Sequence, residues 1–172
     1  MRTERLLLRR PEMSDRDAIV SIAGDWDIAR NLSPVPHPYT DEDAEFFLKT
    51  IVPAQWVWAI TLGESEPLIG CIGLAPTERE HIADLGYWLA REHWGKGYGP
   101  EAVKAVLKVA FDGFGIASVT AGPFAENTAS IKVLEKAGFR FLGDGVRSSL
   151  SIGAKQVSAE FAVSREEFTA AP

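Results

Sequence analysis

The sequence predicts an α+β fold in a single domain spanning residues 1–172. Three short strand-like runs with short links follow one another between Gln55 and Leu89, which is typical of an antiparallel meander. A glycine-rich turn then leads into a long helical pattern in which Val103, Leu107 and Phe111 recur on one face. A second helix and two more strands follow, so strands and helices together account for the chain.

Composition and charge limit the class of protein. Apolar residues make up 46% and charged residues 24% of the chain, as is ordinary for a globular protein. The net charge of −6 argues against general nucleic-acid binding, so an anionic ligand must be held by local features. The single cysteine, Cys71, argues against a disulfide framework or a cysteine metal site, and we expect no metal. The N-terminal apolar run is too short for a signal peptide, and no apolar stretch approaches membrane-spanning length. We therefore expect a cytoplasmic protein with no membrane partner.

The first 54 residues read as a strand and two helices. We expect the strand at Arg5–Arg10 and a helix, capped by Ser14, from Asp15 to about Ala23. Three prolines after this helix predict a loop with a restricted backbone. Thr40 then starts a second helix, which Pro53 is expected to end.

The meander follows, with strands expected at residues 55–62, 68–74 and 81–89. Trp56 and Trp58 alternate on one strand face, and we assign both to the core. Trp26 and the loop at His37–Tyr39 are instead candidates for a substrate mouth, because loops are free to vary.

The elements after the long helix have clear boundaries. A short strand is expected at Ala117–Ala121, and Asn127 opens a helix that Gly138 ends in the left-handed conformation. Two further strands are expected near 140–146 and 156–163, and a capping box at 164–167 starts a final helical turn.

The glycine-rich turn is the main candidate for a binding site. Gly95, Gly97 and Gly99 alternate with Lys96 and Tyr98 directly before the long helix. The first turn of a helix has unpaired N–H groups and the positive end of the helix dipole, and glycines let the backbone approach an anion closely. The turn is therefore predicted to bind a phosphate group.

The same residues also match a dinucleotide-binding fingerprint. Residues 97–102 fit the pattern G-x-G-x-x-A, which belongs in the first βαβ unit of a parallel sheet. Here an antiparallel meander precedes the turn, and no strand-end acidic residue follows about 20 residues on. A nicotinamide-dependent oxidoreductase is therefore the weaker alternative.

A second motif, NTASIKVLEKAGF at Asn127–Phe139, follows at a fixed distance. With it, the chain resembles the GNAT acetyltransferase superfamily, in particular its ribosomal-protein-alanine acetyltransferase-like branch. The turn at Trp94–Gly99 looks like the superfamily's Q/R-x-x-G-x-G/A turn, and GYWL at Gly86–Leu89 resembles the strand before it. The segments RTERLLLRR and TDEDAEFF are similar to the same branch, so the likeness covers nearly the whole chain. It implies a mixed, mostly antiparallel twisted sheet of about seven strands, flanked by helices and splayed between the fourth and fifth strands.

The resemblance implies acetyl-CoA as the acyl donor. The backbone of Tyr87, Trp88 and Leu89 would pair with the pantetheine arm, and Asn127 and Ser130 would also meet the cofactor. The turn would hold the pyrophosphate with Trp94, Gly95, Lys96, Gly97, Tyr98 and Gly99. Two residues depart from the family pattern, since Trp94 replaces the usual Gln or Arg and Pro100 removes a backbone donor. We expect binding to survive with a loss of roughly 1 kcal/mol.

The resemblance also suggests catalytic roles. The amide of Leu89 would stabilise the oxyanion. Many members use a tyrosine for the leaving thiolate, but Leu134 stands at that position here, which makes Ser130 the nearest candidate. The alternative is that Ser130 only helps to cap its helix.

The general base is less defined by the sequence. Asp84 lies on the strand where many relatives place a glutamate, on the same face as Gly86 and Trp88, and a solvated edge carboxylate is the competing interpretation. His37, His81 and His93 are weaker candidates, because a histidine titrates near pH 7.

We therefore predict an N-acetyltransferase that transfers the acetyl group to a primary amine by direct attack in a ternary complex. The acceptor is a protein N-terminus or a small-molecule amine, and a homodimer is kept open. The alternative from another class is a non-catalytic acyl-CoA-binding or sensor domain.

Overall fold

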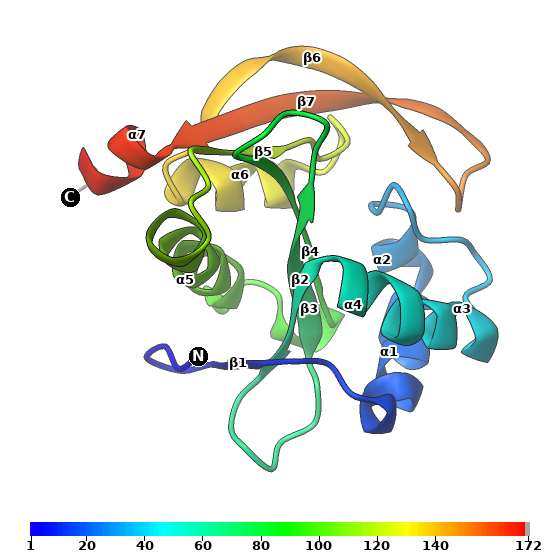
Figure 1. Cartoon of the computed structure of the whole chain (residues 1–172). Coiled ribbons are helices and arrows are strands. Elements are labelled where there is room, and N and C mark those ends of the chain that lie inside the picture. The colour runs from blue at the N-terminus through cyan, green and yellow to red at the C-terminus, as the bar shows by residue number, and fades with distance from the viewer. Residues whose placement is uncertain (171–172) are drawn as a thin grey trace.

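The computed structural model describes residues 1–170, and within them seven strands form one sheet in the order β1-β2-β3-β4-β5-β7-β6 (Figure 1). All neighbouring pairs are antiparallel except β4 and β5, which are parallel. The predicted α+β fold with a mixed, mostly antiparallel sheet is confirmed. The strands are β1 (Leu7–Arg9), β2 (Trp56–Thr61), β3 (Gly70–Pro76), β4 (Ile82–Leu89), β5 (Ser118–Ala121), β6 (Arg140–Ser149) and β7 (Ala154–Ser164).

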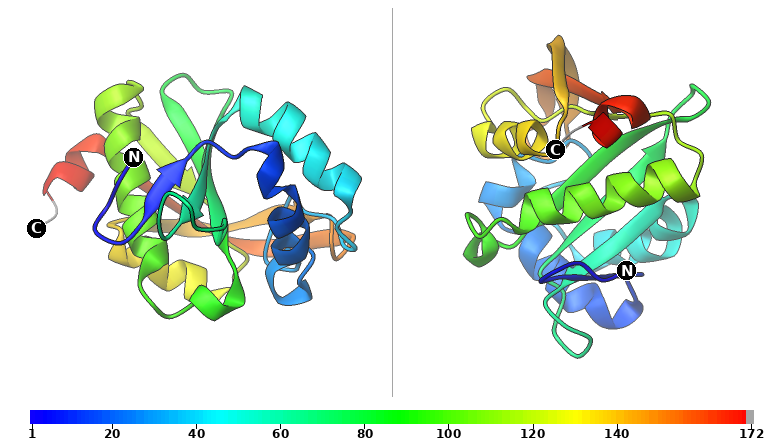
Figure 2. Two further views of the ribbon diagram at one scale, coloured as in Figure 1. Left: turned by 90° about the horizontal axis from the view of Figure 1, so that it is seen from below. Right: turned by 90° about the vertical axis from the view of Figure 1, so that its left-hand side faces the viewer.

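Helices cover both faces of the sheet, as Figures 1 and 2 show. One face packs against α5 and α6 around a large core, and the other packs against α1, α3 and α4 around a smaller one. The helices are α1 (Arg16–Ala23), α2 (Trp26–Ala29), α3 (Asp41–Phe46), α4 (Val52–Ala54), α5 (Tyr98–Gly113), α6 (Thr128–Lys136) and α7 (Arg165–Ala170). Short 3₁₀ turns lie at Met13–Asp15 and Arg91–His93, and a π-helical turn at Phe47–Ile51 joins α3 to α4.

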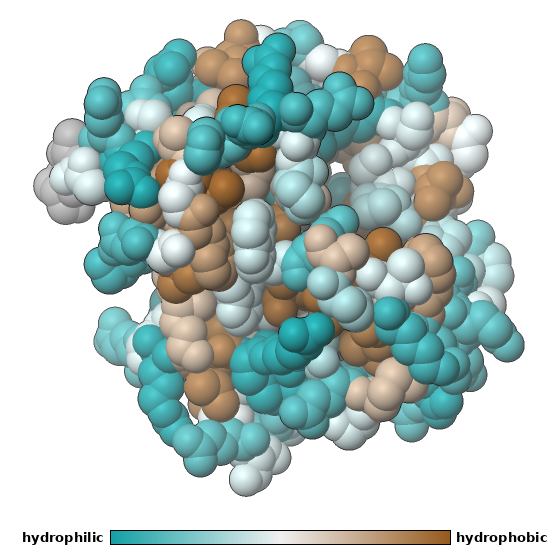
Figure 3. Space-filling view, viewed as in Figure 1, coloured by the Kyte–Doolittle hydropathy of each residue, from teal (hydrophilic) through white to brown (hydrophobic). Residues whose placement is uncertain are grey.

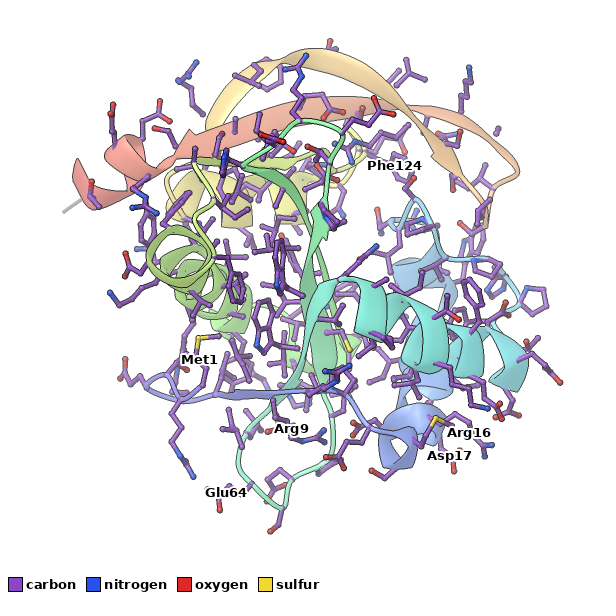
Figure 4. The ribbon with its side chains drawn as sticks, in the orientation of Figure 1. Met1, Arg9, Arg16, Asp17, Glu64 and Phe124 are labelled. Carbon is purple, nitrogen blue, oxygen red and sulfur yellow. The ribbon has the colours of Figure 1, made fainter. Side chains whose placement is uncertain are left out.

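The start of the first helix differs from the prediction. Ser14 does not cap it but lies inside a 3₁₀ turn. The carboxylate of Asp15 instead accepts a hydrogen bond from the backbone of Glu12 at 2.8 Å and holds the guanidinium of Arg9 in β1 at 2.6 and 2.7 Å. Arg9 lies where β1 leads into this turn (Figure 4). Asp15 thus caps the turn through Glu12 and also pairs with Arg9, six residues earlier, so the helical turn begins at Met13, ahead of Ser14.

Other boundaries follow the sequence closely. Thr40 and Asp43 form a capping box at the start of α3, and Ser164 with Glu167 does the same for α7. The helical segment that Thr40 starts ends at Ala54, one residue after Pro53, so the expected end is confirmed to within one residue. The short helix α2 has no counterpart in the prediction.

The sheet splays between β4 and β5, as predicted. Pairing between them ends at Asp84 and Thr120, although β4 continues to Leu89. Beyond Ala121 the chain leaves β4 and follows β7, where the carbonyl of Pro123 accepts from Ala159 and Phe124 bridges to Ser158. Phe124 is buried beneath β7 (Figure 4). Continued pairing with β7 therefore draws this segment away from β4 and opens a gap beside residues 85–89.

The core assignments for two tryptophans are confirmed. Trp56 and Trp58 pack against the larger core and stack on Phe114. Their ring centroids lie 4.8 and 6.3 Å, respectively, from the ring centroid of Phe114. Figure 3 shows hydrophobic residues gathered between α5 and the sheet, with hydrophilic residues dominating the rim. No helix within residues 1–170 is long and apolar enough to cross a membrane.

Candidate active site

The gap beside β4 exposes backbone groups to a ligand. The N–H of Ala90 donates to Ile69 next to β3, so even-numbered residues of β4, including Trp88, direct their backbone groups to β3. By alternation, Tyr87 and Leu89 direct theirs into the gap, where β5 has already departed. Three residues were expected to pair with a pantetheine arm. Two of them, Tyr87 and Leu89, direct their backbone groups into the gap, and Trp88 does not.

The glycine-rich turn lies at the end of this gap and starts α5. Gly95 and Gly97 have φ of 72° and 83°, a region that favours glycine, and Gly97 caps the helix without any side-chain hydrogen bond. The N–H groups of Tyr98 and Gly99 therefore belong to the unpaired first turn of a 16-residue helix. The indole N–H of Trp94 donates to the carbonyl of Leu89 at 2.8 Å and links the turn to β4. This geometry suits a diphosphate.

An arginine far away in the sequence supports the turn. Arg5 donates from Nη1 to the carbonyl of Lys96 at 2.8 Å and from Nε to Glu101 at 2.7 Å. Its guanidinium also lies over the ring of Tyr98, 5.0 Å from the centroid. Burial raises the pKa of Glu101, but hydrogen bonds from Thr3 and Arg5 lower it by more, so the pKa lies below its usual value. Sequence reasoning missed this support, because only the fold brings residue 5 next to residue 96.

We predict that Arg5→Ala weakens CoA binding about three- to tenfold, because the turn loses a hydrogen bond and a charged partner. Calorimetric titration of CoA into the variant measures this effect. Arg2→Ala is the matched control, since Arg2 pairs only with the exposed Glu64. Equal affinity for Arg5→Ala and wild type would show that the turn keeps its shape without the arginine.

The first turn of α6 also faces the gap. Asn127 is the N-cap, as predicted, and its side chain accepts from the N–H of Ser130 at 3.1 Å. The hydroxyl of Ser130 lies 2.8 Å from the phenol oxygen of Tyr87. A side chain at Gly99 would crowd Val133 at 3.3 Å, so this glycine lets the starts of α5 and α6 approach each other. Two helix N-termini, with their positive dipole ends, thus converge on one gap.

The side chain of Tyr87 lies on the face of β4 that packs against the larger core. Burial raises its pKa to about 12, so the phenol keeps its proton at neutral pH. Leu134, at the position of the family tyrosine, is fully buried in the same core. Tyr87 therefore supplies a phenol near Ser130, although Leu134 replaces the tyrosine that many family members have in α6.

Asp84 belongs to an ionic cluster that crosses four strands. Its carboxylate accepts from Arg147 at 2.8 and 3.2 Å and from Thr120 at 2.8 Å. Arg147 also binds Glu160 at 2.7 and 3.0 Å. A side chain at Gly122 would lie within 2.0–2.4 Å of the Arg147 guanidinium, so this glycine makes room for the arginine. The candidate base is thus already paired with a cation, which the sequence did not indicate.

The three histidines lie apart from this cluster. His81 precedes β4 at the end opposite Leu89 and contacts the carbonyl of Gly115 at 3.1 Å. His93 packs near Tyr98 in the 3₁₀ turn, and His37 lies against Trp26 with ring centroids 5.0 Å apart. Trp26 is 45% exposed, which fits a place at the mouth of a substrate site.

The far side of the site is framed by the β6–β7 turn. The N–H of Leu150 donates to the carbonyl of Ser33, and the hydroxyl of Ser151 donates to Ala29 at 3.0 Å. In Figure 1 the two long strands arch over toward α2. These bonds join the β6–β7 turn to the end of α2 and the loop after it. On the face of β4 that carries Asp84 and Trp88, no atom lies within 4 Å of the position of a side chain at Gly86.

A nucleophilic cysteine or a metal site finds no support in residues 1–170. Burial raises the pKa of Cys71 well above its usual value, which keeps the thiol protonated. No group of three His, Cys, Asp or Glu residues in this part of the chain is arranged to hold a metal ion.

The sheet is mixed and splays at its parallel pair, with a glycine turn and two helix N-termini at the opening, and this is a fold of the GNAT acetyltransferase type. The chain belongs to the GNAT acetyltransferase family. Its residues 5–140 match the family described as "Acetyltransferase (GNAT) domain".

Similar proteins support this membership. The chain is 30% identical over 145 residues to the uncharacterized N-acetyltransferase p20 of Bacillus licheniformis, covering 80% of each protein. Its fold is similar to a GNAT-family acetyltransferase from Bacillus anthracis, with a TM-score of 0.85, 26% identity and coverage of 96% and 98% of the two chains. It also matches spermidine N-acetyltransferase from Vibrio cholerae in complex with CoA and spermine, with a TM-score of 0.82, 21% identity and coverage of 97% and 99%.

Proposed function

We propose that this protein is an acetyl-CoA-dependent N-acetyltransferase that acetylates a primary amine in a ternary complex. The gap between β4 and β5, with the glycine turn at its end, is the observation that carries the proposal. The similar Vibrio cholerae structure contains CoA and spermine, which supports a CoA donor and an amine acceptor here. The presence of all seven described strands in one sheet supports a single domain.

Leu89 and Ser130 have separate proposed roles in the transfer of the acetyl group. The nitrogen of the neutral amine forms a bond to the thioester carbon, the C–S bond breaks, and the electron pair leaves on sulfur. The N–H of Leu89 points into the gap and stabilises the developing oxyanion. The hydroxyl of Ser130, at the positive end of α6, donates a hydrogen bond to the leaving thiolate.

The proton released by the amine has two proposed routes. In the first, Asp84 accepts it from the acceptor side of β4. In the second, Asp84 serves only the ion pair with Arg147. The amine then arrives neutral from solvent, and the proton that its nitrogen loses on forming the amide passes to water or to the leaving thiolate. From reference pKa values, neutralising lysine at pH 7 costs about 4.6 kcal/mol, against about 1 kcal/mol for a peptide N-terminus. The second route therefore suits an N-terminal acceptor better than a lysine.

A non-catalytic acyl-CoA sensor is the second candidate, and one observation favours it. Leu134 is buried where many family members carry a tyrosine for the leaving group. Tight CoA binding without amine-dependent thiol release would support the sensor.

An amine-panel thiol-release assay tests the proposal. We expect the wild type to release CoA only with acceptor amine, and Ser130→Ala to lower kcat about three- to tenfold with KM for acetyl-CoA nearly unchanged. Full turnover by Ser130→Ala would contradict the role of this serine.

The base is tested separately. We expect Asp84→Asn to lower kcat about a hundredfold or more, because a neutral amide cannot accept the proton. Asp144→Asn, which neutralises an exposed carboxylate on β6, is the matched control. An unchanged kcat in Asp84→Asn, with a stability loss like that of Arg147→Met, would leave the ion pair as the only role of Asp84.

A further inference from the structure

A phenol–serine pair lies across the opening of the gap. Tyr87 extends from β4 to the first turn of α6, where its oxygen lies 2.8 Å from the Ser130 hydroxyl and 3.4 Å from the Ser130 carbonyl. Asn127 fixes the backbone of the same turn through the N–H of Ser130. The serine side chain is thus held between the strand β4 and the first turn of the helix α6.

The direction of the hydrogen bond decides what the serine can do. A hydroxyl has one proton, so a serine that donates to Tyr87 has none for a sulfur atom. A phenol is more acidic than an aliphatic alcohol, and the buried phenol keeps its proton at neutral pH. The phenol is therefore the better donor of the two. Its one proton has two acceptors, the Ser130 hydroxyl at 2.8 Å and the Ser130 carbonyl at 3.4 Å, and the hydroxyl is the nearer.

We propose that Tyr87 is a positioning residue whose O–H donates to Ser130 Oγ, so that the serine proton is free to point at the leaving thiolate of CoA. This inference rests on the proposed role of Ser130. No proton leaves the phenol, because two hydrogen bonds in a row strengthen each other without transfer. The side chain of Tyr87 thus acts through the serine and does not touch the thioester, whereas its backbone is the part proposed to pair with the pantetheine arm.

The ionisation of bound CoA tests this inference without an acceptor amine. The ultraviolet absorbance of the thiolate is followed against pH for CoA bound to wild type, Tyr87→Phe, Ser130→Ala and the double variant. We expect the acid dissociation constant of the bound CoA thiol to be about three- to tenfold smaller in each single variant than in wild type. The double variant should show no further decrease. The affinity for CoA should stay nearly constant, since the ring of Tyr87 is kept.

Ser118→Ala is the control, because it removes the hydroxyl of another half-buried serine, which donates to the carbonyl of Val163 at 3.2 Å and lies at the far end of the β4–β5 pair. Thermal unfolding checks that each variant folds. An unchanged pKa of the CoA thiol in Tyr87→Phe would overturn the role of Tyr87 while leaving the proposed function intact. Additive effects of Tyr87→Phe and Ser130→Ala on this pKa would do the same. Absence of CoA binding by the wild type would instead overturn the proposed function, and this inference with it.

Discussion

Gly95→Ala should lower the affinity for CoA at least about tenfold. The glycine has φ of 72°, and an alanine there favours a different backbone conformation by about 1–2 kcal/mol. The amides that would face the diphosphate then turn away, and hydrogen bonds to a charged group contribute about 1.5–3 kcal/mol each. Calorimetric titration with CoA measures the loss.

Gly115→Ala is a closely matched control. Gly115 has φ of 67°, and at both glycines no atom lies within 4 Å of the position of an added Cβ. It follows the opposite end of α5, a helix of 16 residues and so about 24 Å long. Both variants should lose similar stability, and only Gly95→Ala should lose CoA. Equal affinities in the two variants would refute the assignment of the turn as the diphosphate site.

Arg147→Met should destabilise the fold by about 2 kcal/mol or more at pH 7. It leaves Asp84 and Glu160 half-buried without their shared cation, and one-sided removal of such a partner is costly. Urea unfolding measures the change. Arg140→Met on the same strand is the control, because its pair with Glu167 is well exposed and should contribute less than about 1 kcal/mol.

The destabilisation should depend on pH. A hydrogen bond from Arg147 lowers the pKa of Glu160 below its usual value. A carboxylate with a lowered pKa stabilises the folded state above its unfolded pKa, about 4.3, and this contribution is lost as the pH falls through the folded pKa. The difference between wild type and Arg147→Met should therefore be largest near neutral pH and shrink below about pH 4. A difference that stays constant well below pH 4, where both carboxylates are protonated, would contradict the ionic origin.

Local chemistry made much of the fold predictable. The capping box at Thr40, the N-cap at Asn127 and the left-handed Gly138 depend on near neighbours in the sequence, and the structure shows each of them. Ser14 failed as a cap because Asp15, its neighbour, accepts from the backbone of Glu12 and pairs with Arg9, so the helical turn starts ahead of Ser14. Two local signals therefore compete at this helix end, and residue type does not decide between them.

The candidate site divides in the same way. The positive φ values of Gly95 and Gly97 follow from residue type, so the turn was visible in the sequence. The support from Arg5, the phenol of Tyr87 at Ser130 and the bridge from Arg147 to Asp84 join residues 43 to 91 positions apart. Their pairing depends on strand order and register, which a single sequence does not specify.

The most direct test is a crystal structure of the protein with CoA, supported by calorimetry on the same sample. We expect the pantetheine arm to pair with the backbone of Tyr87 and Leu89, and the diphosphate to accept hydrogen bonds from the amides of residues 95–99. CoA bound elsewhere on the molecule, or no measurable affinity for it, would contradict the account.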